Sequence, residues 1–345
     1  MQMMWFSSSH HGSRHAGILP AFCVWLTRCS VNAALLTAIV VLMPLSLKAA
    51  PLACISNQLA DSVSILDTQS HRILATVKVA GKPAGVAMTT DGARCYISTP
   101  EAHGFAVIDV GLQRVSAIVK VSDGALGIAL SPDNRRLFVA DWYQNSVAVL
   151  DALTYQSLAT IAVGQSPSGL AVSADNRWLY VANRLSDSVS KIDLRSFSVV
   201  KTVAVGSHPF GITLDARAER LYTANVQSDD VTVIDTHTMR VLATVKVNML
   251  PYAAALAQND SRLFVTNQDD GSVSVIDTQL LKEIGLIEVG MKPEGISTHP
   301  DDRHVYVANW FDGTVSVIDA RTLKVITTLN AGEGSRAFGQ FIASH

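Results

Sequence analysis

The sequence predicts an all-β fold built from seven copies of one four-stranded unit, and three repeated columns carry this prediction. A Ser-Val-Ser-Val-Ile-Asp motif, complete or varied, ends every 42 residues at Asp67, Asp109, Asp151, Asp193, Asp235, Asp277 and Asp319. A polar column that is mostly Asn keeps the same step, at Asn57, Thr99, Asp141, Asn183, Asn225, Asn267 and Asn309. A column of small residues does so as well, at Gly85, Gly127, Gly169, Gly211, Ala253, Gly295 and Ala337. Because no insertion interrupts the step, the whole chain after the N-terminal segment is one repeat array.

Each copy predicts four short strands, rich in Val, Ile, Leu, Tyr and Thr and separated by turns. In one unit they are Ser168–Leu170 and beyond, Trp178–Ala182, Val189–Asp193 and Ser198–Val205. No stretch after residue 50 sustains a helical period. A four-stranded unit of about 40–45 residues is typical of a β-propeller blade. We therefore expect residues 50–345 to form a single seven-bladed β-propeller domain.

The two ends of the array predict how the ring closes. The first strand after the N-terminal segment, Ala53–Asn57, aligns with second strands. The C-terminal segment Ser335–Ile342 aligns with the first-strand segment that begins at Pro83. The C-terminal strand should therefore complete the N-terminal blade from the inside and join the chain ends by hydrogen bonds, which leaves no long free edge.

Residues 1–49 differ from the rest, with an apolar stretch over Val31–Leu47, no acidic residue, and three basic ones at Arg14, Arg28 and Lys48. A positive leader, an apolar stretch and small residues predict a signal peptide cleaved near Ala49 or Ala50. A retained membrane anchor is the alternative, although Pro44 interrupts the stretch. Lipidation at Cys54 is a third possibility. Each predicts a periplasmic, secreted or cell-surface protein.

Composition excludes several classes of protein. The 345 residues are 48% apolar and 16% charged, which excludes general disorder. The formal charge of −2 gives no basic excess for nucleic acid. None of the four cysteines lies in a CxxC or CxxCH motif, so zinc ribbons and covalent c-type haem are not expected. Cys54 and Cys95 lie on second strands of successive blades, and either a disulfide or two buried thiols fits them.

The repeats resemble those of the YVTN β-propeller family. The resemblance lies in Leu179–Asn183 with Ser188–Asp193, and in Tyr306–Asn309 with Thr314–Asp319. Ala337–Ile342 also resembles the closing segment of bacterial members. The likeness covers residues 53–342 and implies an exported or surface-located bacterial protein. Most such proteins have no assigned reaction, some related propellers are lactonases or haem- or quinone-dependent proteins, and the family supplies no catalytic motif.

The repeated residues favour structural roles. A turn aspartate accepts backbone N–H groups two residues on, and seven carboxylates spread around a ring cannot converge on one ion. The small column should let blades approach each other where the ring is narrow. A column of Tyr and Phe should pack between blades, at Tyr96, Phe138, Tyr180, Tyr222, Phe264 and Tyr306.

Function is therefore expected where the repeat is broken, on the upper face, which carries the loops before strand one and between strands two and three. The residue that begins strand one differs in every blade: Ala84, Leu126, Ser168, Phe210, Tyr252, Glu294 and Arg336. With neighbouring loops, this face offers a bowl of candidate ligand- or partner-binding residues. They are the cations Lys82, Arg184, Lys292 and Arg336, the carboxylate Glu294, His208, and the aromatics Trp142, Phe210, Tyr252 and Trp310. Glu294 and Arg336 should also pair across the channel.

Two functions fit these residues. The sequence favours a non-enzymatic binding or scaffold protein that holds a protein, peptide or glycan through exposed tryptophans, without cofactor, metal or catalytic residue. The alternative is a propeller enzyme or cofactor protein: a lactonase-like hydrolase using Glu294 and Arg336, or a haem- or quinone-dependent protein using His208. The constant 42-residue step argues for the first, because active-site propellers usually carry long insertions. We expect no metal site among the histidines after residue 50.

Overall fold

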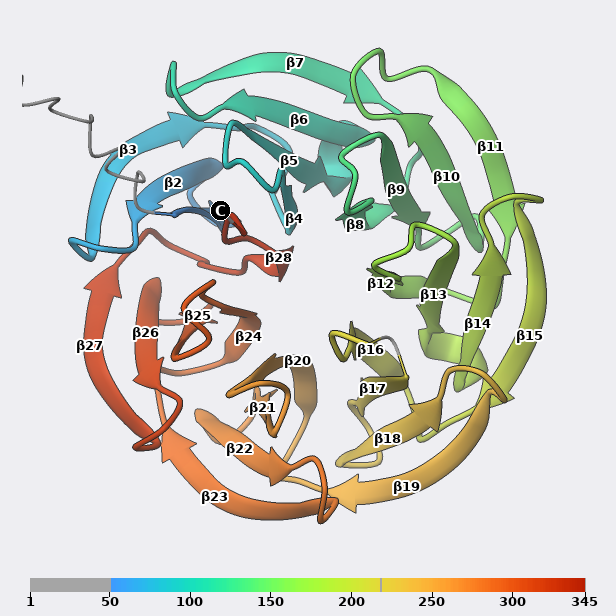
Figure 1. Ribbon diagram of the computed structural model, residues 1–345. Coiled ribbons are helices and arrows are strands. Elements are labelled where there is room, and N and C mark those ends of the chain that lie inside the picture. The colour runs from blue at the N-terminus through green and yellow to red at the C-terminus, as the bar shows by residue number, and fades with distance from the viewer. Residues whose placement is uncertain (1–50, 218, 345) are drawn as a thin grey trace, which may run out of the picture. The chain divides into compact units, whose positions relative to one another are not determined.

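The computed structural model describes residues 51–344 except residue 218, and in it seven sheets form a closed ring around a central channel (Figure 1). The segment predicted as signal peptide or anchor, residues 1–49, lies outside the described residues. Within the described part of the chain, no helix has the length and apolar content needed to cross a bilayer.

The seven sheets are numbered here as blades in chain order. Blade 1 holds β1 (Leu52–Asn57), β2 (Ser62–Asp67) and β3 (Arg72–Lys78). Blade 2 holds β4 (Gly85–Met88), β5 (Arg94–Thr99), β6 (Gly104–Asp109) and β7 (Arg114–Lys120), and blade 3 holds β8 (Ala125–Leu130), β9 (Arg136–Asp141), β10 (Ser146–Asp151) and β11 (Ser157–Ala162). Blade 4 holds β12 (Pro167–Val172), β13 (Trp178–Asn183), β14 (Ser188–Asp193) and β15 (Ser198–Ala204), and blade 5 holds β16 (Pro209–Leu214), β17 (Arg220–Asn225), β18 (Asp230–Asp235) and β19 (Arg240–Lys246).

The remaining elements follow the same order. Blade 6 holds β20 (Pro251–Ala257), β21 (Arg262–Asn267), β22 (Ser272–Asp277) and β23 (Lys282–Glu288), and blade 7 holds β24 (Pro293–Thr298), β25 (His304–Asn309), β26 (Thr314–Asp319) and β27 (Lys324–Asn330). The C-terminal strand is β28 (Phe338–Gln340), and two short 3₁₀ helices are η1 (Pro100–Ala102) and η2 (Arg184–Ser186).

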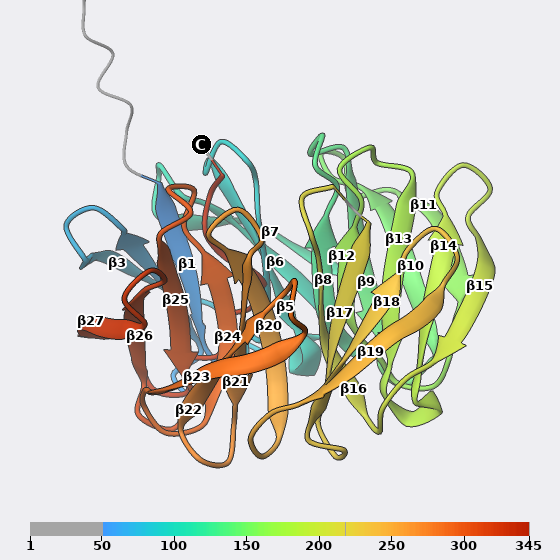
Figure 2. The same ribbon diagram turned by 60° about the horizontal axis from the view of Figure 1, so that its bottom comes forward.

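Within each full blade the first strand lies at the channel and the fourth at the outer edge of the ring, and neighbouring strands are antiparallel (Figure 1). In blade 4 the second and third strands are buried along almost their whole length, whereas the fourth is exposed along almost all of its length. The turns gather at two faces (Figure 2). We call the face with the turns between strands one and two the lower face. The predicted seven-bladed propeller is confirmed.

Buried hydrogen bonds explain two of the repeated columns. Asn267 Nδ2 donates to Ser272 Oγ and Ser274 Oγ, both at 2.9 Å, and so ties the second strand to the third. The same two-acceptor pattern starts from Asn57, Asn183, Asn225 and Asn309. The aspartates close the next turn, as where Asp277 Oδ1 accepts the N–H groups of Gln279 and Leu280 at 2.9 and 2.8 Å. These columns are structural, as predicted.

The small-residue column sets the distance between neighbouring first strands. A Cβ added to Gly127 would lie 1.8 Å from the carbonyl oxygen of Ser168 in the next blade. At Gly295 it would lie 2.1 Å from the carbonyl oxygen of Ala337. Both are far inside van der Waals contact, so these positions require glycine and the ring is narrow at its axis.

The C-terminal segment closes the ring as predicted. It runs antiparallel to β1, with Cys54 N donating to Phe341 O at 2.9 Å and Arg336 N donating to Ser56 O at 2.8 Å. Its strand β28 also pairs in parallel with β4 of blade 2 (Figure 1). A disulfide joins Cys54 to Cys95, so the first two blades are linked covalently. A bridge of this loop length stabilises a fold by about 2–4 kcal/mol.

We expect Phe341→Ala to lower the free energy of unfolding by about 3–5 kcal/mol, because Phe341 is fully buried in the closing segment. Removing Ser335–His345 should cost more, since it also opens the hydrogen-bonded seam. Phe311→Ala is the control: its ring is 63% exposed, and the change should stay within about 0.5 kcal/mol. Urea unfolding measures all three, and an unchanged stability of the truncated chain would contradict closure by this segment.

Candidate functional site

Aromatic side chains fill the upper mouth of the channel at its axis. The Phe210 ring lies with its centroid 4.1 Å from that of Tyr252 and 4.8 Å from that of Phe338. All three are at most 6% exposed. The predicted bowl is therefore closed at its centre, and a ligand on this face would rest above these rings or beside them.

We call Phe210, Tyr252 and Phe338 the aromatic plug. Glu294 and Arg336 form the predicted ion pair beside it. Arg336 Nε lies 2.8 Å from Glu294 Oε2, and Gln268 Nε2 donates to Glu294 Oε1 at 2.7 Å. Arg336 also donates to the Tyr252 hydroxyl. Burial raises the pKa of Glu294, and the Arg336 charge opposes that rise. With both carboxylate oxygens engaged and the side chain buried, Glu294 is not placed to activate water, and the lactonase-like role does not fit.

Of the other three predicted cations, two pair with carboxylates at the edge of the channel mouth on the upper face, which we call the rim. Lys82 Nζ lies 3.4 Å from Asp61 Oδ2, and Lys292 Nζ lies 2.6 Å from Asp269 Oδ1. Arg184, in η2, has no carboxylate partner among the described residues. Its guanidinium lies 5.3 Å from the ring centroid of Trp142.

The expectation of exposed tryptophans is wrong. Trp142 lies 6.1 Å from the Phe210 ring, and Trp310 Nε1 donates to Gln58 Oε1 at 3.0 Å. Each tryptophan directly follows a second strand and folds back over the ring, so that both are half-buried. The next residues, Tyr143 and Phe311, stand out instead, with 68% and 63% of their surface exposed.

His208 lies in the loop just before β16, two residues before Phe210. Its Nδ1 is 3.2 Å from Ser207 Oγ and 4.0 Å from Asp187 Oδ1, and its backbone N–H donates to the same Asp187 oxygen at 2.7 Å. Among the described residues, none hydrogen-bonds its Nε2. We call Trp142, Arg184, His208 and Phe210 the rim site.

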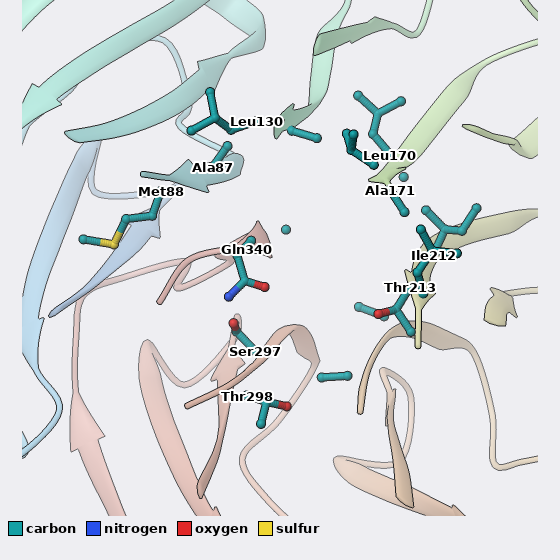
Figure 3. A pocket seen from close by; sticks show the side chains of 18 of the residues that line it. Ala87, Met88, Leu130, Leu170, Ala171, Ile212, Thr213, Ser297, Thr298 and Gln340 are labelled. Atoms are coloured by element: carbon teal, nitrogen blue, oxygen red, sulfur yellow. The ribbon is translucent and has the colours of Figure 1, made fainter. Parts of the chain in front are cut away.

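A cavity of about 610 Å³ lies in the lower half of the channel, where Phe338 and residues of the turns between strands one and two, such as Pro132 and Asp260, are among its lining. Small, apolar and hydroxyl side chains of the first strands line it, among them Ala87, Leu130, Ala171, Ile212, Thr213, Ser297 and Thr298 (Figure 3). Among the described residues, its lining includes Asp260 but no histidine, lysine or arginine. Sequence analysis missed this cavity because its walls belong to ordinary strand positions, and the many Ala, Ser and Thr there are the one available signal.

Lys191 is a second feature that sequence analysis missed. It is 8% exposed, it occupies a column that holds Val or Ile in the other blades, and burial lowers its pKa. Its Nζ donates to the Thr236 carbonyl at 2.7 Å and lies 4.1 Å from the Trp178 ring centroid. Trp178 occupies a column that is mostly Arg. One repeat earlier this column holds Arg136, which donates at 2.9 Å to the carbonyl of Leu194, the residue aligned with Thr236. Lys191 thus replaces a missing arginine, which is a structural role.

Two family models match parts of the chain, each less than half of it. The cytochrome D1 heme domain matches residues 221–336, and the YNCE-like beta-propeller matches residues 112–220. No curated protein matches the chain. Both models agree with the observed fold, and they place the chain among β-propeller proteins.

Solved structures share the fold at low identity. Kuenenia stuttgartiensis hydrazine synthase aligns with TM-score 0.71 and 22% identity over 77% of this chain and 92% of that one. A functionally unknown protein from Desulfotomaculum acetoxidans DSM 771 gives 0.73 and 15%, over 84% and 100%. Dihydro-heme d1 dehydrogenase NirN in complex with DHE gives 0.63 and 18%, over 82% and 64%.

The match to the cytochrome D1 heme domain corrects the functional expectation. It contradicts the non-enzymatic binding or scaffold protein and favours the alternative, a propeller with enzyme-like or haem-related chemistry. The constant repeat length therefore gives no argument against chemistry in this chain.

We expect Arg336→Met to cost about 3–5 kcal/mol of stability at neutral pH, because it leaves the buried Glu294 carboxylate without its partner. The loss should shrink as the pH falls, because protonation of Glu294 removes the unpaired charge. The double change Glu294→Gln with Arg336→Met should cost less than Arg336→Met alone at neutral pH. Thermal unfolding across pH measures this, and a pH-independent loss would contradict a buried ion pair.

We expect Trp178→Arg and Lys191→Val to be coupled. The double change restores the arginine–valine combination of Arg136 with Val149 in blade 3, whereas Trp178→Arg alone places two cations at one carbonyl. The double variant should be about 1–3 kcal/mol more stable than the sum of the single effects predicts. Urea unfolding of the four proteins measures the coupling, and additive changes would show that Lys191 has another role.

Proposed function

We propose that this chain is a haem-related cofactor propeller that holds a haem-type tetrapyrrole at its rim site. The observation that carries the proposal is the His208 imidazole, with Nδ1 toward Ser207 and Asp187 and Nε2 without a partner among the described residues. A ligating histidine typically has its other ring nitrogen held by a polar group in this way. The cytochrome D1 heme domain match and the likeness to a dihydro-heme d1 dehydrogenase support the choice of cofactor class.

The residues at the rim site fit a haem, and those of the channel cavity do not. A haem requires an axial ligand such as histidine, apolar surface for its ring, and cations for its acidic groups. The rim site offers His208, the half-buried Trp142 ring that packs on the buried Phe210, and Arg184, whose charge has no carboxylate partner among the described residues. The described residues that line the cavity include no histidine, lysine or arginine.

The surrounding residues hold the rim site in one geometry. Asp187 accepts the His208 backbone N–H, and Ser207 and Asp187 lie near its Nδ1. Both the backbone and the imidazole of His208 are therefore held in place. Phe210 is packed on Tyr252 and Phe338, which leaves it little freedom to move. A bound haem would supply redox chemistry at its iron, and these residues would bind and orient it.

An exported location accompanies this proposal. The Cys54–Cys95 disulfide supports an oxidising compartment such as the periplasm or cell surface. The charge and apolar pattern of residues 1–49 supports the same route.

We expect the full chain to bind added haem with the Soret shift of a histidine-ligated iron, and His208→Gln to weaken binding at least about tenfold and to lose that shift. His237→Gln is the matched control, since His237 is exposed on a lower-face turn whose column holds Gln69 and Gln279. Absorption titration measures both. The same spectrum and affinity with His208→Gln as with His237→Gln would overturn the rim site as the haem site.

A further inference from the structure

We propose that His299, Asp301 and His304 form a binding site for a divalent transition-metal ion, in the first place Zn²⁺. The three residues lie on the lower face, in the turn that joins β24 to β25 and at the start of β25. This site is separate from the rim site on the upper face and does not depend on the proposed haem function.

The ligand atoms already converge. One donor atom from each of the three side chains lies within 4.8 Å of the other two. His304 Nδ1 is 2.6 Å from Asp301 Oδ2, and His299 Nδ1 is 3.0 Å from Asp301 Oδ1, so the carboxylate stands between two imidazole nitrogens. Two imidazoles and one carboxylate are a donor set that binds Zn²⁺ and leaves a coordination position open.

The neighbouring cation does not compete for this carboxylate. Arg303 directs its guanidinium to Asp319, with Nε and Nη2 at 2.9 and 2.7 Å from Oδ2. Asp301 itself accepts the backbone N–H groups of Arg303 and His304 through Oδ1, at 2.9 and 3.0 Å, which fixes the carboxylate within the turn.

A second layer of polar contacts holds the first imidazole. His299 Nε2 lies 3.1 Å from Thr68 Oγ1, which belongs to the turn after β2 in blade 1. Metal-binding histidines typically have their second nitrogen held in this way, which fixes the ring orientation. Tyr306 donates from its hydroxyl to the Thr68 carbonyl at 3.0 Å, and its oxygen lies 3.3 Å from His71 Nδ1. The site thus sits on the seam between blades 7 and 1.

The repeat shows that this turn departs from its usual chemistry. In blades 3 and 4 the residue aligned with His299 is a serine, and Ser131 Oγ donates to Asp133 Oδ1 at 2.6 Å. The residue aligned with His304 is Arg in four blades, and it bonds a carbonyl of the next blade from Arg136, Arg220 and Arg262.

Blade 7 gives up the arginine bond to a carbonyl of the next blade, and the side chain that reaches blade 1 from this turn is His299, which contacts the Thr68 hydroxyl. The Tyr306 bond to Thr68 is not a substitute, because Tyr96 makes the same bond to the Ala152 carbonyl at 2.8 Å elsewhere in the ring. The contact of His299 with Thr68 accounts for one nitrogen of one histidine, whereas both imidazoles turn an Nδ1 toward Asp301 and complete a metal-binding donor set.

The test is a Zn²⁺ competition titration of the full chain against a chromophoric chelator. His10, His11 and His15 are changed to Gln in every protein used, so that the N-terminal histidines contribute no sites. We expect one Zn²⁺ per chain in this background and at least about 100-fold weaker binding after His304→Arg or His299→Ser, each of which introduces the residue of other blades. Thr68→Val should weaken binding about 10–100-fold, and His237→Gln should leave it unchanged.

Each alternative outcome overturns the metal site. The first is that the background protein does not bind one Zn²⁺ per chain. The second is that His304→Arg leaves the Zn²⁺ affinity unchanged, and the third is that His237→Gln weakens Zn²⁺ binding as much as His304→Arg does. Circular dichroism checks each fold, and His304→Gln replaces His304→Arg if that variant unfolds. Haem titration of the His304→Arg protein separates the two proposals, because its haem affinity should match that of the background even if Zn²⁺ binding is lost.

Discussion

The close approach of the seven first strands is the constraint on which the rest of the structure depends. At Gly127 and Gly295 the backbones of adjacent blades come so near that a single Cβ does not fit. The channel is therefore narrow enough for a few large side chains to fill it, and Phe210, Tyr252 and Phe338 do so at the upper mouth. Groups able to bind a ligand on that face are displaced outward to the rim, where His208 and Arg184 lie.

The features that could be predicted from sequence are those that follow from aligning the seven repeats with one another. A 42-residue step gives the number of blades, and the position of Ser335–Ile342 in that alignment gives the closing strand. The Glu294–Arg336 pair follows from their equivalent places on adjacent first strands. The direction that a loop side chain takes is not in the alignment, because it depends on what surface lies beside the loop. Trp142 folds onto Phe210 instead of facing solvent for that reason.

The functional expectation failed on a different point. Long insertions are needed when loops must build the walls of a pocket. In this ring the strand ends and ordinary-length loops already bring Phe210, Trp142 and Arg184 together, and His208 lies two residues before Phe210. A constant repeat length therefore measures only how regular the blades are. It carries no information on whether a histidine at the rim is positioned by a carboxylate, and that positioning is what a cofactor site requires.

Positions where one blade departs from the residue type of the other blades are of two kinds. One kind has a structural explanation, and the other points to a function. Where Trp178 replaces arginine, Lys191 appears on the adjacent strand and bonds the matching carbonyl, so the two departures compensate each other within one blade. Where His304 replaces arginine, the second departure is His299, which contacts the Thr68 hydroxyl of blade 1 but not the carbonyl oxygen that the arginine bonds in other blades. Both histidines instead face the carboxylate of Asp301. A pair of departures that repairs a contact is explained by the fold, whereas a pair that builds a new donor set calls for a ligand.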